Sequence, residues 1–298
     1  KTTHSRLTFA QAFNSLGTTI FPYFGAILIL GGLAGVTAAE LSGAELAAYR
    51  TAESQAIVNG YLGLAAALAV VAGVVWMFRD RLKGEKHEQT SLAEGLALLA
   101  RPRFGYGAAC IFLYVGAEVA IGSFIVNYLM QPGVMALPEQ AAGKLIGLYW
   151  GGAMIGRFVG ALLTRFIAPI YVLATNAVIV ILLLVLSINS SGELAMWSVL
   201  AVGFFNSIMF PTIFTLAIRG LGPLTSRGSG LLCQAIVGGA VLPLLQGMVA
   251  DSSSVQWSFV VPMLAYFYIC WYALSGSRLS VTTAQPATIS TPQTETRS

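Results

Sequence analysis

The chain alternates between long apolar runs and short polar connections. A transmembrane helix needs about 20 mostly apolar residues. Runs of that length cover Leu7–Gly31, Gln55–Phe78, Phe104–Met130, Leu145–Thr164, Ile167–Ser187, Leu194–Ile218, Ser229–Val249 and Trp257–Ser275. Strands of a membrane barrel would alternate in polarity over about 10 residues, whereas Val178 to Leu186 is apolar throughout. The pattern predicts an all-α, polytopic membrane bundle of eight transmembrane helices.

Composition supports a membrane protein and charge placement orients it. Apolar residues make up 56% of the 298 residues and charged residues only 9%, against about 25% in a soluble protein. Thirteen Lys and Arg residues fall on one set of connections, and only Arg50 and Lys144 on the other. Because Lys and Arg favour the cytoplasmic side, we expect a multi-pass protein with both termini in the cytoplasm. The net charge of +4 is too scattered for nucleic-acid binding.

The longest charged connection divides the chain. It runs over residues 79–103 and contains Ser91 and Glu94 at the spacing of a helix capping box, ahead of a leucine-rich stretch that ends at Pro102. We expect a cytoplasmic hinge with a short surface helix. The predicted segments are residues 1–78 with two spans, the hinge at 79–103, a six-helix bundle at 104–275, and a tail at 276–298 whose Thr, Ser and Pro content predicts disorder.

The residues needed for many kinds of catalysis are absent. His4 and His87 lie in polar connections, and Asp80 and Asp251 only flank spans. The three cysteines lie in apolar runs without metal-ligand spacing, and neither a Walker A motif nor an HExxH motif occurs. We therefore expect neither an enzyme nor a metal or cofactor site. Transport driven by an ion gradient remains.

Polar residues inside the spans are the best functional candidates, because polar groups in hydrocarbon are costly. Gln11 and Asn14 lie three residues apart in the first span and continue into Ser15 and Thr18. The resulting stripe is about two turns long, and its amides offer donors and acceptors suited to sugar hydroxyls. The alternative is that these amides hydrogen-bond a neighbouring helix.

Glu118 is the only acidic residue deep in a span. It lies about 14 residues, or roughly 20 Å, into its predicted helix, where desolvation favours the neutral acid. It could carry a proton or accept a hydrogen bond from a substrate hydroxyl. The alternative is a structural pair with Arg157, which lies about 7 residues from the cytoplasmic end of its own predicted span. Asn127 lies nine residues after Glu118, near the outer boundary.

The remaining candidates are distributed over the later spans. Gly152, Gly156 and Gly160 repeat every four residues and predict close helix packing. Arg157, within this strip, either anchors a cytoplasmic gate or extends its charge to the membrane surface. Further possible substrate-binding residues are Asn206, five residues before a kink expected at Pro211, Gln234 in the seventh span, and Trp150, which could stack on a sugar ring or belong to an interfacial aromatic belt.

Several of these segments together resemble the fucose:proton symporter family of the major facilitator superfamily. Within that family the resemblance is to the branch of the bacterial glucose/galactose transporters. Arg6–Thr19 is similar to the fifth span of that family, Gly116–Leu129 to the seventh, Tyr149–Arg157 to the eighth, and Gly203–Thr212 and Ser226–Gln234 to the tenth and eleventh. The matched segments occur in the family's order and cover nearly the whole chain. The family has twelve spans, so we expect that the first four are missing from this chain.

The resemblance implies two six-helix bundles around a central sugar site that works by alternating access. It places Gln11 and Asn14 among the sugar-binding residues and the family's hinge at residues 79–103. The acidic residues linked to proton coupling in the fucose member lie on spans that this chain does not match, so no equivalent is carried over. The full-length protein is expected to be a monomer that uses the proton gradient.

Three functions compete at this point. The leading hypothesis is proton symport of a hexose, glucose or galactose, across a bacterial inner membrane, with an N-acetylglucosamine-type substrate as the main rival. The second is a sugar facilitator without proton coupling. The third is a truncated, non-transporting half that binds partner helices through the Gly152, Gly156 and Gly160 strip.

Overall fold

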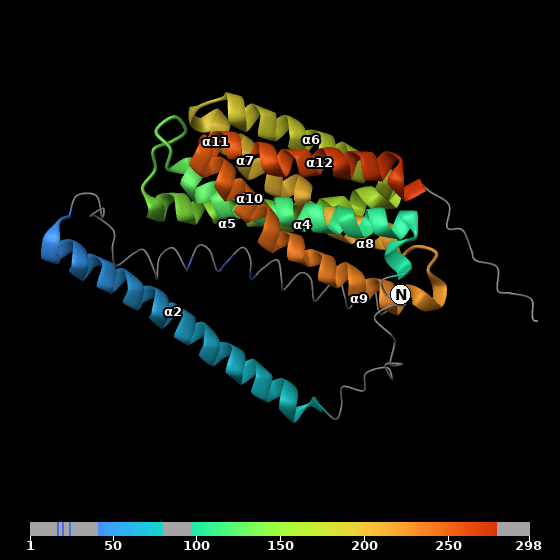
Figure 1. The fold of residues 1–298 in the computed structure, drawn as a ribbon, viewed down its shortest axis with the longest axis horizontal. Coiled ribbons are helices and arrows are strands. Elements are labelled where there is room, and N and C mark those ends of the chain that lie inside the picture. Colours follow the sequence, from blue (N-terminus) through green and yellow to red (C-terminus); the bar gives the residue numbers. More distant parts are fainter. Residues whose placement is uncertain (1–16, 18–19, 21–23, 25–40, 80–96, 279–298) are drawn as a thin grey trace, which may run out of the picture.

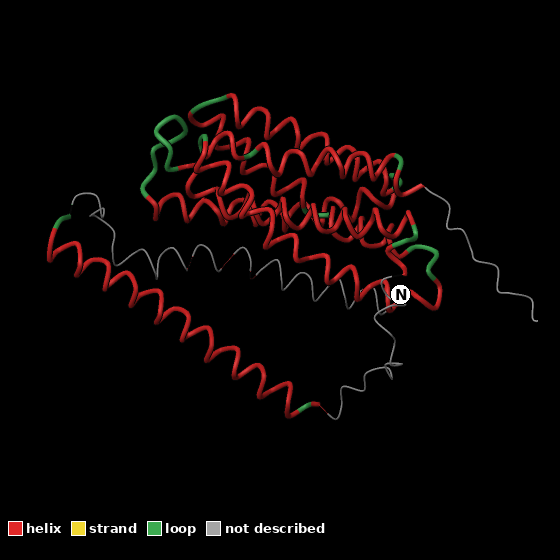
Figure 2. The backbone as a smooth tube through the Cα atoms, in the orientation of Figure 1, coloured by secondary structure: helices red, strands yellow, loops and turns green. Residues whose placement is uncertain are grey.

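The computed structural model describes Gly17, Ile20, Phe24 and residues 41–79 and 97–278. Within these residues every regular element is a helix (Figure 2). Seven helical stretches among them are long and apolar enough to cross a membrane, so the chain is a multi-pass membrane protein. Apart from Gly17, Ile20 and Phe24, the first predicted span lies outside the described residues, as does the predicted capping box of the hinge.

Helix α2 (Gly43–Met77) lies apart from the other helices (Figure 1). It begins well before Gln55, where the apolar run starts, because the preceding segment is rich in the helix formers Ala, Glu and Leu. None of its residues is buried, and Trp76 is 69% exposed. A helix that is apolar on every side needs lipid or other helices around it.

The helices after the hinge form one bundle (Figure 1). Its members are α4 (Pro102–Leu129), α5 (Glu139–Phe166), α6 (Pro169–Asn189), α7 (Gly192–Asn206), α8 (Met209–Ile218), α9 (Thr225–Gln234), α10 (Gly238–Ser252), α11 (Val255–Ser258) and α12 (Val260–Leu274), with the short 3₁₀ helices η5 (Gly222–Leu224), η6 (Ala235–Val237) and η7 (Gly276–Arg278). Helix α4 packs against α5, α8, α10 and α12, and α7 packs against α5 and α6. Helix α4 is therefore the central element.

Prolines mark two of the helix starts. Pro102 opens α4 and Pro169 opens α6. Proline is favoured at the first helical position because its fixed φ suits the helix and its missing N–H has no partner to lose there. Ahead of Pro102, Leu98 is buried against the bundle. At the described end of the predicted surface helix, Leu98 thus packs onto the bundle while Leu99 stays exposed.

Two predicted boundaries need correction. Helix α5 starts at Glu139, six residues before the predicted Leu145, because polar residues continue a helix beyond the hydrocarbon and an acidic first turn suits the helix dipole. Tyr149 and Trp150 thus lie about three turns after the start of α5. The tail predicted as disordered from Gly276 begins with the ordered η7, where Ser277 is buried. Residues 279–298 lie outside the described chain.

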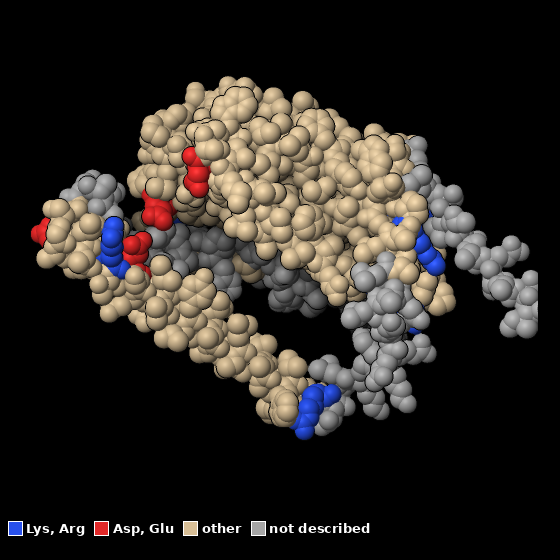
Figure 3. All heavy atoms as spheres, viewed as in Figure 1, with Lys and Arg blue, Asp and Glu red and all other residues tan. Residues whose placement is uncertain are grey.

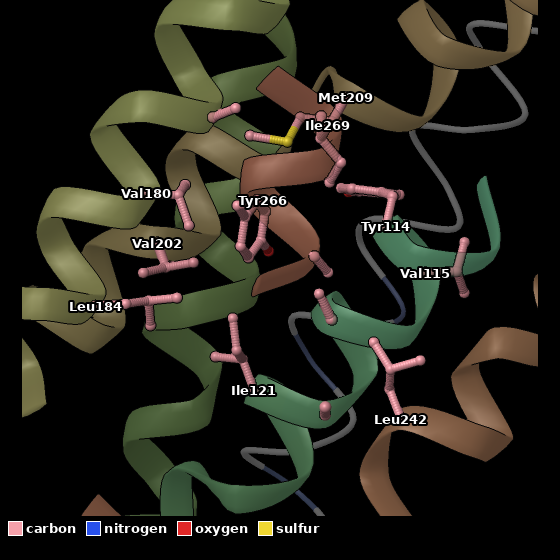
Figure 4. Close-up of a cluster of buried hydrophobic side chains, with 14 of the residues drawn as sticks. Tyr114, Val115, Ile121, Val180, Leu184, Val202, Met209, Leu242, Tyr266 and Ile269 are labelled. Atoms are coloured by element: carbon pink, nitrogen blue, oxygen red, sulfur yellow. The ribbon is translucent and has the colours of Figure 1, made fainter. Parts of the chain in front are cut away.

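The core of the bundle is made of aromatic and branched side chains around α4 and α12. Figure 4 shows Tyr114 of α4 and Tyr266 of α12 near Met209, with Val180 and Val202 beyond. All five side chains are almost fully buried. Two buried tyrosines in such a core require hydrogen-bond partners for their hydroxyls, and those partners lie at the break between α7 and α8.

Candidate functional site

The helix formed by α7 and α8 is interrupted in the middle of its span. Helix α7 ends at Asn206 and α8 begins at Met209. The cause is Pro211, which has no N–H and so cannot donate to the carbonyl of Ser207 four residues earlier. The sequence predicted one span with a kink at Pro211, whereas the structure breaks the helix one turn before it. In hydrocarbon each unpaired backbone carbonyl costs several kcal/mol.

Side chains of three other helices supply the missing donors. The carbonyls of residues 205–207 each accept a hydrogen bond from a different helix. Asn176 Nδ2 of α6 donates to Phe205 at 3.0 Å, the Tyr114 hydroxyl of α4 donates to Asn206 at 2.8 Å, and Arg157 Nε of α5 donates to Ser207 at 3.4 Å. The break is therefore held by α4, α5 and α6 together.

The side chain of Asn206 occupies the centre of this arrangement. Its Nδ2 donates to the Tyr149 hydroxyl at 3.1 Å, and its Oδ1 accepts from the Tyr266 hydroxyl at 2.9 Å. Asn206 is 0% exposed. With its amide engaged on both sides, Asn206 positions α5, α7 and α12 in this conformation. A direct role in sugar binding stays a prediction.

Glu118 lies one turn after Tyr114 on α4 and is half-buried. Its carboxyl hydrogen-bonds the Tyr114 side chain and interacts electrostatically with Arg157. Tyr149 and Tyr266 also lie within its electrostatic range. The only deep acid thus faces the residues that hold the broken helix. Its role in proton coupling is not tested by this geometry.

The glycine strip of α5 brings its backbone against α7. A Cβ on Gly156 would overlap the Phe204 carbonyl and the Ser207 side chain, and one on Gly160 would overlap Ile208. At Gly152 a Cβ would lie 3.4 Å from the Phe204 nitrogen. The absence of side chains at these positions lets α5 approach closely enough for Arg157 to reach Ser207.

The other predicted site residues lie outside this network. Asn127 is exposed near the end of α4, and Gln234 is exposed at the end of α9. Trp150 is half-buried and packs edge-on against Tyr149, with ring centroids 5.0 Å apart. Gln11 and Asn14 lie outside the described residues, so the structure neither places them nor brings them to Glu118.

Two amides, one half-buried and one buried, escaped the sequence analysis. Asn176 in α6 caps the Phe205 carbonyl. Gln246 in α10 is 0% exposed, donates to Ser258 Oγ at 3.2 Å, and leaves its Oε1 without a hydrogen-bond partner. Both are single amides in apolar spans, so the rule that selected Gln11 and Asn206 would also have selected them.

Comparison with known proteins identifies the family. No family model matches the chain. The chain is 46% identical over 279 residues to the glucose/galactose transporter of Brucella abortus biovar 1, covering 93% of this chain and 65% of that protein. It is 42% identical to the putative glucose/galactose transporter of Helicobacter pylori strain J99, covering 91% and 65%. It is 30% identical to the L-fucose-proton symporter of Escherichia coli K12, covering 91% and 64%.

A solved structure gives the same fold. The crystal structure of the major facilitator superfamily transporter FucP in its outward conformation superimposes with a TM-score of 0.68 at 28% identity, covering 93% of this chain and 69% of FucP. The chain spans about 65% of the length of the first two curated relatives. Similarity over nearly all of its own length, in sequence and in fold, places the chain in the fucose:proton symporter family of the major facilitator superfamily, on the branch of the glucose/galactose transporters.

Proposed function

We propose that this protein is a secondary active sugar transporter that moves a hexose together with a proton across a bacterial inner membrane. The observation that carries the proposal is the 46% identity to a protein named glucose/galactose transporter. Glucose or galactose is therefore the proposed substrate. Such transporters take their energy from an ion gradient, so the protein needs neither a catalytic centre nor a cofactor.

The geometry of the bundle supports this mechanism. Transporters of this kind commonly build their sites at interrupted helices near the middle of the membrane. Here the α7–α8 break lies beside Glu118, which lies 16 residues after Pro102, about 24 Å along α4. An uncharged sugar needs hydroxyl partners and no counter-charge, which fits a site with so few charges. We propose that Gln11 and Asn14 contribute from the other bundle, with Glu118 and Trp150 on this one.

The distribution of charge supports an orientation. Acidic side chains gather at the end of the bundle where α5 begins, and arginines at the opposite end (Figure 3). The arginines in or next to the helix ends on that basic side are Arg101, Arg103, Arg165, Arg219 and Arg227. By the preference of Lys and Arg for the cytoplasm, we infer that this end and both termini of the chain face the cytoplasm.

Uptake of labelled sugars tests the proposal. The complete reading frame that encodes this chain is expressed in a bacterium without its own hexose uptake, and glucose, galactose, N-acetylglucosamine and fucose are compared. We expect accumulation of glucose or galactose above the external concentration, and its collapse on addition of a protonophore. Equilibration without accumulation would indicate a facilitator. Absence of uptake of all four sugars, with the protein present in the membrane, would contradict transport of a hexose.

A further inference from the structure

We propose that Glu118 controls the break between α7 and α8 through the single hydroxyl hydrogen of Tyr114. Tyr114 is then a positioning residue that links the protonation of a carboxyl to the backbone of another helix. The inference rests on the proposed function, because it describes how a proton would act on the same site. It concerns α4, α5 and α7, all of which lie in the described bundle.

The first step is a count of hydrogens. A tyrosine hydroxyl has one hydrogen to donate, and Tyr114 donates it to the Asn206 carbonyl at 2.8 Å. A carbonyl can only accept, so this hydrogen is committed. With that hydrogen committed, the carboxyl beside Tyr114 can share a hydrogen bond with it only as the donor, which needs a protonated Glu118. We assign the protonated form of Glu118 to the arrangement in which Tyr114 holds the Asn206 carbonyl.

The second step follows the loss of that proton. An ionised carboxylate accepts only, and its hydrogen bonds are stronger than those of a neutral carbonyl. Glu118 would then draw the Tyr114 hydrogen away from Asn206. The carbonyl of Asn206 would lose its donor in a place where no water replaces it. Deprotonation thus removes one of the three hydrogen bonds that hold the break.

Arg157 adds a second effect of the same sign. It interacts electrostatically with Glu118, and its hydrogen bond to Ser207 is long at 3.4 Å. A negative charge on Glu118 would attract the guanidinium and weaken that bond further. Two of the three caps on residues 205–207 therefore depend on the same proton, while the cap from Asn176 does not.

The surroundings contain no competing acid. Arg157 and Tyr149 face Glu118 from α5, and Tyr266 faces it from α12. Helix α8 has no titratable residue. The residues of α10 that face α4 include Gly238, Gly239 and Leu242, none of which is titratable. The one acid of α10, Asp251, lies near the far end of the helix. Among the described residues, Glu118 is thus the only acid at this position.

The test measures hydrogen exchange of backbone amides around the break. Purified full-length protein is compared at about pH 6 and about pH 8, with the intrinsic effect of pH on exchange divided out. We expect amides of residues 205–213 to exchange about fivefold faster at the higher pH, the factor that one lost hydrogen bond gives. Both E118Q and Y114F should abolish this dependence, with E118Q slow and Y114F fast at either pH.

The matched control is Tyr128→Phe on the same helix. The Tyr128 hydroxyl also donates to a backbone carbonyl, that of Ser187 at 2.7 Å, but it lies nearly three turns beyond Glu118. Y128F should keep the pH dependence. The inference is overturned if Y114F keeps it, or if the unmodified protein shows none.

The hydrogen-exchange experiment and the uptake experiment can each contradict one proposal without contradicting the other. If the protein accumulates no sugar but its break responds to pH through Tyr114, the proposed function is wrong and the link between Glu118 and α7 stands. If it accumulates sugar while Y114F and the unmodified protein share one pH response at the break, the transport proposal stands and this inference falls.

Discussion

Arg157 Nε donates to the backbone oxygen of Ser207, which is the carbonyl that Pro211 leaves without a helical donor. This hydrogen bond gives Arg157 a structural role inside the membrane. The sequence alone predicted that Arg157 either anchors a cytoplasmic gate or extends its charge to the membrane surface. The glycine strip of α5 packs closely against α7, and the guanidinium of Arg157 therefore reaches the break. A neighbouring helix thus compensates for the missing N–H of a proline.

Replacing Arg157 by Lys keeps the charge and removes the planar guanidinium. A lysine ammonium is a compact, strongly hydrated charge and cannot present the same donor. We expect the maximal rate of sugar uptake to fall about tenfold, since a hydrogen bond from a charged group contributes about 1.5–3 kcal/mol. Arg165→Lys, at the exposed end of the same helix, is the control and should transport normally. Equal rates in the two variants would exclude a special role for Arg157.

Asn206→Ala should destabilise the bundle. The change leaves the Tyr149 and Tyr266 hydroxyls without their partner, and a buried unsatisfied polar group costs about 1–3 kcal/mol. We expect a clear fall in the thermal unfolding midpoint of the purified protein, measured by intrinsic fluorescence in detergent. Asn127→Ala, at an exposed position on α4, should change that midpoint little. A stable N206A protein that has lost sugar binding would instead make Asn206 a direct ligand.

The sequence predicted the helices better than the polar network. Apolar runs define spans because only hydrocarbon-length helices satisfy their backbone in a bilayer, but they miss polar turns such as the one that begins at Glu139. Glu118 and Arg157 could be selected because charges are so rare in these spans. Tyr114, Tyr149 and Tyr266 could not, because tyrosine is common in membrane helices. Their role appears only in the folded structure, where Tyr114 donates to the Asn206 carbonyl and the other two hydroxyls hydrogen-bond the Asn206 side chain.

Gly156→Ala tests the close approach of α5 and α7. A methyl group there would meet the Phe204 carbonyl and the Ser207 side chain, and overpacking typically costs about 1–3 kcal/mol. We expect a lower unfolding midpoint and slower uptake, because Arg157 is pushed away from the break. Gly230→Ala in α9 is the matched control, since no atom outside its own turn lies within 4 Å of the added carbon. An unchanged G156A protein would mean that the strip does not determine the spacing.

Gln11→Ala and Asn14→Ala test the proposed sugar contacts on the first span. Each amide is expected to hydrogen-bond a sugar hydroxyl, and loss of one such bond weakens binding by about 0.5–1.5 kcal/mol, or roughly 2- to 13-fold in the dissociation constant. Calorimetric titration of galactose into the full-length protein measures the change directly. Asn189→Ala serves as the comparison, because Asn189 is exposed at the end of α6. Unchanged affinity in both first-span variants would remove that pair from the site.

Glu118→Gln separates proton coupling from sugar movement. Glutamine keeps the size and hydrogen-bonding capacity of a protonated carboxyl but can neither release nor take up a proton. If Glu118 carries the coupled proton, the variant should still exchange labelled for unlabelled sugar across proteoliposomes and should lose accumulation driven by an imposed pH gradient. In the unmodified protein we expect the rate of sugar exchange to fall as pH rises, because Glu118 loses its proton. The variant has no proton to lose at this position, so its exchange rate should not fall. Glu139→Gln, at an exposed position in the first turn of α5, should keep both activities. Gradient-driven accumulation that survives in E118Q would leave Glu118 at most a sugar ligand and would require the coupling acid to lie elsewhere.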